Sequence, residues 1–390
     1  MNESLSKSEN SVQGATTQHA APQASCDIEA IVLDLWDRVL ERGPEARKAS
    51  IRDLKVGLLR VHRLLAEIAQ ATGIFIPITA LFKVDTSDKL VAVLRSGSAP
   101  AAEPLAELKA GEGASALFFF PGISGVALEL AELGGLIRYD GPIYANQPRG
   151  LDGAERPHRT VAEMADYQVA VIRAAQPRGP YRLSGYSFGG LVAVEVARRL
   201  QEAGESVDFL GLMEPSLPER QWPLHGRAEF FWRRSKHHAR ALRALSPHAR
   251  RAYLASHAEP MVNRFRRMLG AKAVGSSPYH RAGLPPGLAE TREAGWAAIQ
   301  THELKPYPGK ATLFASERGN PLGCDTLLAY PKLLRQWEVR RFSGDHSGML
   351  REPHVHDLAH QISCCLAEIN NGAMTASGSF QSHRSSQRGI

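Results

Sequence analysis

Short runs of apolar, β-prone residues alternate with amphipathic stretches from about residue 114 onward. Helical stretches separate several of these runs, and in residues 191–200 the apolar positions recur at spacings of three and four. Strands that alternate with helices usually form a mostly parallel sheet covered on both faces, so the pattern predicts an α/β domain. The predicted strands are Ala116–Phe120, Pro142–Ala145, Tyr181–Leu183, Phe209–Met213, Ala311–Phe314 and Trp337–Phe342.

A long interval without a convincing strand separates the fourth run from the fifth. Residues 215–306 are rich in arginine, histidine and aromatic side chains and have a helical pattern. We interpret this segment as a helical lid inserted over the site of the α/β domain.

A small helical unit is predicted before the α/β domain. The stretch 28–40 places its apolar residues on one stripe of a helix. A second helix is expected over residues 56–72 with Gly73 as its C-cap, and a third over residues 87–94 with Thr86 as its N-cap.

The composition divides the chain into folded and unfolded parts. Residues 1–26 and 371–390 are polar and are predicted to be disordered. Residues 97–113 are rich in Ala, Pro and Gly and are predicted to be a linker. The folded parts are then the helical unit 27–96 and the α/β domain 114–370.

The overall composition is that of a soluble globular protein, with 43% hydrophobic and 22% charged residues. No apolar run approaches the length of a membrane span, and the first 25 residues lack the apolar core of a secretory signal. Cys26, Cys324, Cys364 and Cys365 show neither metal-site spacing nor a disulfide framework. We therefore expect a cytoplasmic protein with no membrane partner, no metal and no cofactor of its own.

Positive charge is concentrated in residues 220–270, which hold twelve Lys or Arg and two Glu, whereas the whole chain has a net charge of +7. Such a segment attracts an acidic protein or a phosphate-bearing partner. The alternative is an exposed helical face whose arginine stems cover apolar surface. We do not expect a nucleic-acid partner.

The sequence Gly185-Tyr186-Ser187-Phe188-Gly189 lies between a β-prone run and a helix. Gly-x-Ser-x-Gly in this context is the nucleophile elbow of α/β-hydrolases, in which a sharp turn presents the serine above the sheet. Glycines on both sides of the serine allow that bend. Ser187 is therefore the predicted nucleophile; the alternative is a glycine-rich turn with a bystander serine.

A serine hydroxyl needs an adjacent base, and the base needs an orienting acid. In this fold the order along the chain is serine, acid, histidine. His346 follows the last predicted strand and is the predicted base. Glu214, at the end of the fourth run, is the favoured acid, and Glu317 is the alternative.

The tetrahedral intermediate of such a reaction needs backbone N–H donors. We expect one from Phe188, directly after the nucleophile. The second should come from the loop after the first predicted strand, where Ile123 is our choice and Ser124 is next.

Residues from about 114 to 370 resemble the thioesterase domains that end nonribosomal peptide and polyketide assembly lines. The matching stretches include FFFPGISG, IYANQPRGLDG, RLSGYSFGGLVAVEVARRL, PYPGKATLFASE and FSGDHSGMLREP. The resemblance implies an α/β-hydrolase fold and a partner, a carrier protein or synthetase, that bears an acyl-phosphopantetheine. The acyl or peptidyl chain would pass to Ser187 and be released by water or by an internal nucleophile. The family usually has Asp at the position of Glu214.

Residues 27–96 resemble a peptidyl or acyl carrier domain, a small all-α bundle that usually precedes such a thioesterase. The family's attachment pattern is Asp-Leu-Gly-Gly-Asp-Ser-Leu, and this chain reads DLKVGLL at residues 53–59, with Leu58 in place of the pantetheinylated serine. The second helix, usually acidic, carries Lys55, Arg60 and Arg63 at its start. We expect a degenerate carrier-like unit that docks or positions but carries no substrate.

Two other functions remain open at this point. One is a small-molecule esterase or acyltransferase of the same fold. The other is a non-catalytic docking protein, in which Glu214 and Leu58 would mark the loss of the usual catalytic acid and of the attachment serine. The sequence identifies no substrate-binding residues and does not decide between hydrolysis and cyclisation.

Overall fold

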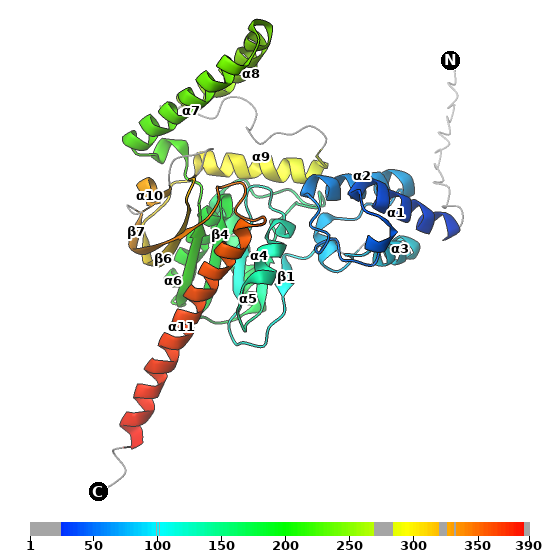
Figure 1. Cartoon of the computed structure of the whole chain (residues 1–390). Helices are drawn as coiled ribbons and strands as arrows, with labels where there is room; N and C mark the ends of the chain where they lie inside the picture. The colour runs from blue at the N-terminus through cyan, green and yellow to red at the C-terminus, as the bar shows by residue number, and fades with distance from the viewer. Residues whose placement is uncertain are drawn as a thin grey trace, which may run out of the picture.

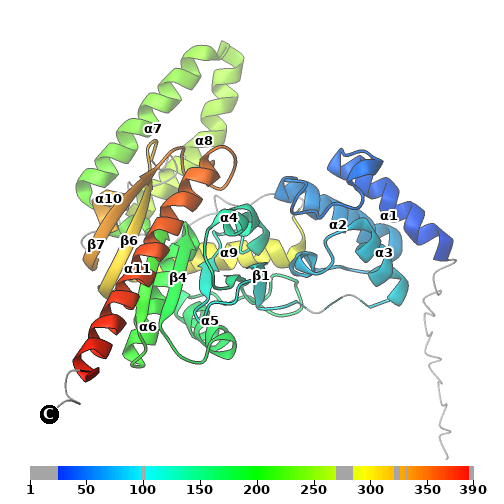
Figure 2. The same cartoon turned by 60° about the horizontal axis from the view of Figure 1, so that its bottom comes forward.

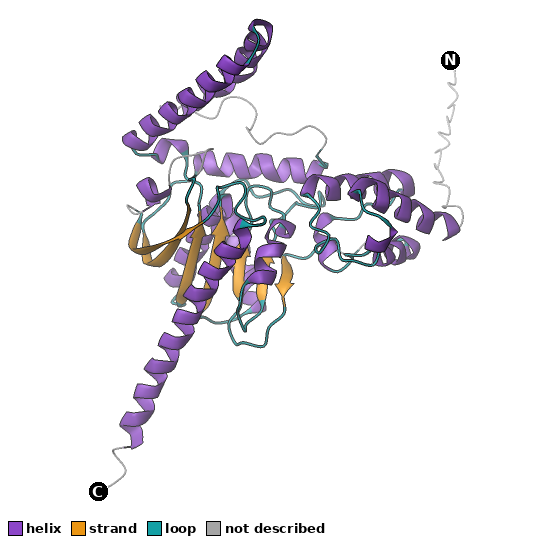
Figure 3. Ribbon diagram, viewed as in Figure 1, coloured by secondary structure: helices purple, strands orange, loops and turns teal. Residues whose placement is uncertain are grey.

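The computed structural model describes residues 25–98, 100, 102–268, 284–319, 326–330 and 333–385. A seven-stranded sheet in the order β1-β3-β2-β4-β5-β6-β7 forms its centre, and all neighbouring pairs are parallel except β1 with β3. Figure 3 shows this sheet between layers of helices. The strands are β1 (Leu105–Lys109), β2 (Leu117–Phe120), β3 (Ile143–Asn146), β4 (Tyr181–Tyr186), β5 (Val207–Met213), β6 (Tyr307–Ser316) and β7 (Leu334–Phe342).

Each face of the sheet is covered by its own hydrophobic cluster. Successive side chains of a strand point to opposite faces, so Phe118 and Phe120 of β2 join one cluster while Leu117 and Phe119 join the other. The first cluster includes α5 (Val161–Ala175) and α6 (Phe188–Glu202), and the second includes α4 (Ala131–Leu136) and α11 (His354–Ser385). The predicted α/β class with a mostly parallel sheet is confirmed.

Strand β1 lies inside residues 97–113, where the sequence predicted only a linker. It pairs antiparallel with β3 at the edge of the sheet, and Ala106 and Leu108 are buried. Its pattern Leu-Ala-Glu-Leu-Lys alternates correctly for a strand, but the run is short and lies in an Ala/Pro/Gly-rich segment that masks the signal.

The lid segment, residues 215–306, contains helices and no strand in its described part. It contains η4 (Glu219–Gln221), α7 (Leu224–Ala244), α8 (Pro247–Met268) and α9 (Pro286–Thr301), and residues 269–283 lie outside the described part. Figure 1 shows α7 and α8 projecting as a hairpin, whereas α9 crosses the top of the sheet. We call α7 and α8 the α7–α8 hairpin.

The helical unit 27–96 contains α1 (Ser25–Leu40), η1 (Pro44–Ala46), α2 (Leu58–Thr72), η2 (Ile78–Phe82) and α3 (Ser87–Ser96). The predicted caps are confirmed. Gly73 ends α2 in the left-handed conformation at φ 73°, and the Thr86 side chain accepts a hydrogen bond from the Lys89 N–H at 3.3 Å. Both views of the chain show α9 reaching from the sheet to this unit (Figures 1 and 2).

One hydrophobic cluster joins the helical unit to the α/β domain. Its buried members include Leu64 and Leu81 from the unit, together with Val126, Leu151 and Leu288 from the α/β domain. An ion pair adds to this contact, because the Lys55 ammonium binds the carboxylates of Glu132 (3.1 Å) and Glu352. The helical unit is therefore packed against the α/β domain rather than tethered beside it.

The chain ends differ in part from the predicted disorder. Residues 1–24 and 386–390 lie outside the described part, but α11 continues to Ser385, past residue 371 where we expected a disordered tail. A helix already packed on a core propagates at low cost, because each added residue adds a hydrogen bond. Cys364 and Cys365 of α11 are free thiols, and no described helix is long and apolar enough to cross a membrane.

Candidate active site

Ser187 occupies a strained turn between β4 and α6. Its backbone has φ 52° and ψ −116°, a conformation that residues with a Cβ rarely adopt. The turn is tied down on both sides, because the Ser187 N–H donates to the Met213 carbonyl at 3.0 Å and the Ser187 carbonyl accepts from the Ser216 N–H at 2.9 Å. The predicted elbow geometry is present, and the surrounding structure holds it in place.

The glycines of the motif allow the helix after the elbow to approach the sheet. A Cβ at Gly189 would collide with the backbone carbonyl of Phe120, and a Cβ at Gly185 would collide with the carbonyl of Gly189. Only glycine fits at either position, since backbone rather than a flexible side chain occupies the space. This close packing places the N-terminus of α6 beside the loop that follows β2.

Ser187, His346 and Glu214 form one continuous hydrogen-bonded chain. The Ser187 Oγ lies 3.1 Å from His346 Nε2, and His346 Nδ1 lies 3.1 Å from Glu214 Oε2. A carboxylate only accepts, so Nδ1 carries the proton and Nε2 is left to accept from the serine. His346 and Glu214 are 6% and 3% exposed, so water competes weakly for these bonds. The structure brings together the three residues that the sequence singled out.

The structure also distinguishes the two candidate acids. Glu214 is held from behind, because its Oε1 accepts from the Ser316 N–H at 2.9 Å and from the Ser316 hydroxyl. Glu317 is exposed, and its N–H pairs with the Phe342 carbonyl at 3.1 Å in the continuing sheet. Ser316 therefore turns Glu214 toward the histidine, and Glu317 lies outside the hydrogen-bonded chain.

Two further residues contact the reacting groups and were not predicted. The Tyr186 ring stacks on the His346 ring at 5.3 Å, and its hydroxyl donates to the His346 carbonyl at 2.8 Å. The Ser216 hydroxyl lies 3.2 Å from the Ser187 hydroxyl. Tyr186 lies inside the serine motif and Ser216 lies two residues after Glu214, so both could have been suspected from their positions in the sequence. Their contacts with His346 and Ser187 depend on the fold and could not be predicted.

The side chains of the two predicted oxyanion residues, Phe188 and Ile123, both lie beside Gly295 of α9. Phe188 is the first residue of α6. The first backbone N–H groups of a helix have no carbonyl partner within the helix, and the helix dipole favours negative charge there. Ile123 lies in the loop after β2, and a Cβ added at Gly295 of α9 would lie 3.4 Å from both the Ile123 and the Phe188 side chains.

A partly buried carboxylate that the sequence did not reveal holds this loop. Glu129 accepts the Gly122 N–H at 2.5 Å and the Ser124 hydroxyl at 2.8 Å, so it grips the residues on either side of Ile123. Burial raises the pKa of the Glu129 carboxyl to about 7, although the hydrogen bonds from Ser124 and Gly122 and the charge of Arg292 on α9 oppose this rise. The Ser124 hydroxyl is thus committed to the loop's own structure.

The charge of Arg292 also acts on a residue of the helical unit. Burial, and next the charge of Arg292, lowers the pKa of His62 on α2 to about 4. The charge of Arg292 thus acts on both groups: it favours the charged form of Glu129 and, after burial, disfavours the charged form of His62. Among the described residues, no group of three or more His, Cys, Asp or Glu side chains could hold a metal ion.

Comparison with known proteins supports the interpretation of this geometry. The model of the Thioesterase domain family matches residues 115–363. Indigoidine synthase of Streptomyces lavendulae is 31% identical over 210 residues, which is 51% of this chain. Vanchrobactin synthetase VabF of Vibrio anguillarum is 28% identical over 317 residues, which is 79% of this chain.

A solved structure resembles the fold of nearly the whole chain. It is a holo four-domain nonribosomal peptide synthetase bound to AMP and glycine, with a TM-score of 0.52, 21% identity and coverage of 91% of this chain and 27% of that one. This chain also spans only 15% of the indigoidine synthase and 10% of the vanchrobactin synthetase. With the family model covering more than half of its residues, the chain belongs to the thioesterase domain family and is a thioesterase of the α/β-hydrolase fold.

Proposed function

We propose that this thioesterase releases an acyl or peptidyl chain from the phosphopantetheine thioester of a carrier domain in nonribosomal peptide or polyketide-type biosynthesis. The observation that carries the proposal is the chain of hydrogen bonds from Ser187 through His346 to Glu214. A nucleophile, a base and an orienting acid in this order perform acyl transfer through a covalent intermediate.

Each residue has a defined role in the proposed reaction. His346 Nε2 takes the proton of Ser187 as its oxygen attacks the thioester carbonyl, and Glu214 stabilises the imidazolium that forms. The N–H groups of Phe188 and Ile123 receive the oxyanion. Collapse of the tetrahedral intermediate breaks the C–S bond, and His346 returns the proton to the departing thiol. Water or an internal nucleophile then repeats the sequence on the acyl-serine.

The helical unit is proposed to be carrier-like in fold but unable to carry the substrate. Leu58 stands at the expected attachment position, is partly buried and packs against the cluster shared with the α/β domain. A leucine offers no oxygen for a phosphodiester bond, and Lys55 nearby is paired with Glu132 and Glu352. The substrate would therefore arrive on a different carrier domain.

Incubation with coenzyme A and a broad phosphopantetheinyl transferase tests this role of the helical unit. The intact mass should stay unchanged, while a bona fide carrier domain in the same tube gains a pantetheine mass. A pantetheine adduct on residues 27–96 would overturn the proposal for this unit.

The kinetic test of the function compares matched substrates. The same acyl group is presented in three forms: on a carrier, as a pantetheine thioester and as the corresponding oxygen ester. Comparing their rates separates the proposed activity from that of a small-molecule esterase. We expect the highest kcat/KM for the carrier-bound thioester. Faster turnover of the oxygen ester, with no gain from the carrier, would favour the esterase instead. Product analysis of the same reactions separates hydrolysis from cyclisation.

A further inference from the structure

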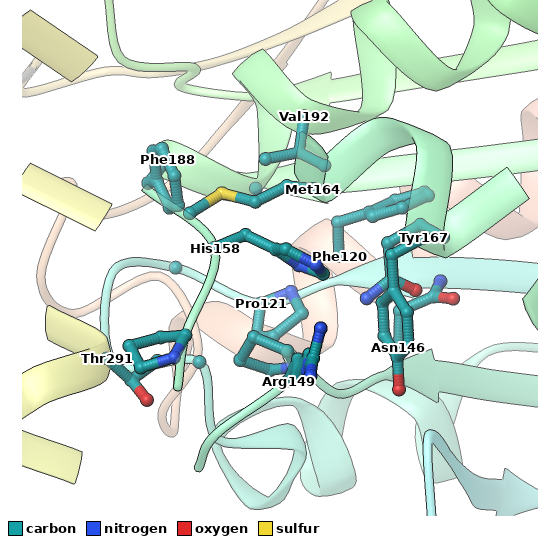
Figure 4. Close-up of a pocket in the computed structure, with 16 residues that line it drawn as sticks. Phe120, Pro121, Asn146, Arg149, His158, Met164, Tyr167, Phe188, Val192 and Thr291 are labelled. Carbon is teal, nitrogen blue, oxygen red and sulfur yellow. The ribbon is translucent and has the colours of Figure 1, made fainter. Parts of the chain in front are cut away.

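The loop after β2, residues 121–125, carries the proposed oxyanion donor Ile123 and borders open space. Together with Phe188 of α6 and Thr291 of α9 it lines a pocket of about 490 Å³, part of which is open to solvent. Figure 4 shows Pro121 of the loop, Phe188 and Thr291 around this pocket. We call residues 121–125 the oxyanion loop. Packing cannot fix a loop on the side where it borders open space, so other contacts must hold its N–H groups.

Glu129 supplies such contacts. It lies in the short helix η3 (Ala127–Leu130), and its carboxylate oxygens accept the Gly122 N–H at 2.5 Å and the Ser124 hydroxyl at 2.8 Å. These two partners lie on either side of Ile123 in the chain. The direction of the Ile123 N–H therefore depends on where η3 places the carboxylate.

The helical unit packs on the segment that carries Glu129. Val126, immediately before η3, is 1% exposed, and Leu128 within η3 is partly buried. Val126 belongs to the hydrophobic cluster whose other members come mostly from the unit, such as Leu64 and Leu81, and Leu128 packs against that cluster. Neighbouring residues of one short helix therefore contact the unit and the oxyanion loop.

An ion pair adds a second link between the unit and the site. The Lys55 ammonium binds Glu132 at 3.1 Å in the first turn of α4, which directly follows η3. It also binds Glu352, which lies between His346 and α11. One side chain of the unit thus holds both the segment after the oxyanion loop and the segment after the catalytic histidine.

Helix α9 forms a third link. Leu288, near its start, is buried in the cluster shared with the unit, whereas Gly295 lies beside the Ile123 and Phe188 side chains. Seven residues are about two helical turns, so Leu288 and Gly295 lie on the same face of α9. The helix therefore connects the unit directly to the two proposed oxyanion residues.

We propose that Glu129 is a positioning residue for the reaction and that the helical unit holds it in place, so that the unit serves the chemistry at Ser187 without carrying a substrate. This inference rests on the proposed function, because it takes the Ile123 N–H as a donor to the oxyanion. Glu129 acts through the oxyanion loop, and the unit acts through η3, Lys55 and α9.

Two substitutions of Glu129 test its role with a small pantetheine thioester, which needs no carrier. Glu129→Leu removes both acceptors and should lower kcat at least about tenfold with KM changed less than about twofold, because the displaced donor acts in the transition state. Glu129→Gln can still accept the Gly122 N–H and should keep at least about one third of the wild-type kcat. Glu107→Leu, at an exposed glutamate of β1, is the matched control and should retain the wild-type kcat.

A trifluoromethyl ketone that adds to Ser187 gives a readout that loss of folded protein does not change. Its adduct carries an oxyanion, so its inhibition constant should rise in Glu129→Leu by about the factor by which kcat/KM falls. A purely structural role would lower kcat and leave the inhibition constant as in the wild type. That result, or a folded Glu129→Leu protein with the wild-type kcat, would overturn the positioning role.

Charge reversal at Lys55 tests the link to the helical unit. Lys55→Glu places like charges against Glu132 and Glu352 and should lower kcat for the same thioester about fivefold, with KM unchanged. Adding Glu132→Lys restores an opposite-charge pair and should bring kcat back to within about twofold of the wild type. Lys48→Glu, at another exposed lysine of the unit, is the control. A wild-type kcat in Lys55→Glu, or the same loss in Lys48→Glu, would overturn the role of the unit.

Failure of the proposed function gives a different result. A wild-type protein that hydrolyses no thioester and forms no fluorophosphonate adduct would overturn the proposed function and this inference together. A wild-type protein that hydrolyses thioesters, with none of the expected losses in Glu129→Leu and Lys55→Glu, would overturn the inference alone.

Discussion

A single methylene distinguishes Glu214 from the aspartate that the family usually has at this position. The structure shows how the longer side chain is accommodated. Glu214 has a positive φ of 42°, and Ser316 holds its Oε1 while Oε2 reaches His346 at 3.1 Å. The backbone conformation and the serine partner offset the added length, so the carboxylate still meets the imidazole.

Substitution of Glu214 tests this account. Glu214→Gln should lower kcat for thioester hydrolysis roughly 10³-fold, because a neutral amide neither fixes the tautomer nor stabilises the imidazolium. Glu214→Asp keeps the charge but shortens the reach, so a smaller loss of about tenfold is expected. Glu317→Gln is the matched control and should retain the wild-type rate; an equal loss there would contradict the assignment of the acid.

Glu129 gives the stability of the protein a pH dependence. Its pKa is raised from 4.5 to about 7 in the folded state, so folding favours the protonated form. Its stabilising contribution is present below pH 4.5 and is lost as the pH rises through 7. Glu129→Gln should therefore reduce the difference in unfolding free energy between about pH 5 and pH 8 by about 2 kcal/mol.

Denaturant unfolding of both proteins at the two pH values measures that difference. Glutamine can still accept from the Gly122 N–H, so a folded variant is expected. An unchanged pH dependence would mean that the loop carboxylate titrates normally.

At the scale of elements, the sequence predicted correctly those features that depend only on neighbouring residues. The caps at Gly73 and Thr86 and the elbow at Ser187 follow from residue types at a turn, and each is found where the sequence placed it. Strand β1 was missed because its alternating pattern is only five residues long and lies in an Ala/Pro/Gly-rich segment, and its pairing with β3 is not visible in the sequence. The contacts of Ser216, Ser316 and Glu129 were unpredictable for the same reason, since each depends on where other elements pack.

Helix α2 carries the second pH-dependent group. The pKa of His62 is lowered from 6.5 to about 4, so the folded state disfavours its protonated form. Its contribution to stability is complete above pH 6.5 and is lost as the pH falls toward 4. His62→Leu should reduce the loss of unfolding free energy between about pH 7 and pH 4.5 by about 2 kcal/mol.

Thermal or denaturant unfolding across that range provides the measurement. His360 is an exposed histidine on α11, and His360→Leu is a control that should leave the pH dependence as in the wild type. If the unfolding free energy of His62→Leu depended on pH as strongly as that of the wild type, α2 would not bury a neutral imidazole.

At the scale of the whole molecule, the helical unit and the α7–α8 hairpin occupy different ends of α9 (Figures 1 and 2). The helical unit is fixed by the shared hydrophobic cluster and by Lys55. The hairpin instead exposes Trp232, Leu254 and Phe265 beside many arginines. A separate acidic carrier would find charge complementarity at the hairpin, so we propose that it approaches from that end.

Neutralising exposed arginines of the hairpin tests this assignment. The triple change Arg240→Gln, Arg243→Gln and Arg251→Gln should raise KM for a carrier-bound thioester about tenfold and weaken its salt dependence. KM for a pantetheine thioester should change less than about twofold, because that substrate has no protein surface to attract. Arg335→Gln with Arg341→Gln, on the edge strand β7 and outside the hairpin, is the control. Equal effects on both substrates would contradict docking at the hairpin.

The central claim is that Ser187 is an activated nucleophile, and intact-mass analysis after fluorophosphonate treatment tests it most directly. The account predicts one adduct on the wild-type protein, none on Ser187→Ala and slow labelling of His346→Ala. Ser124→Ala should be labelled like the wild type, since that hydroxyl only supports the loop. The absence of an adduct on the folded wild-type protein, or an adduct that persists in Ser187→Ala, would contradict the claim.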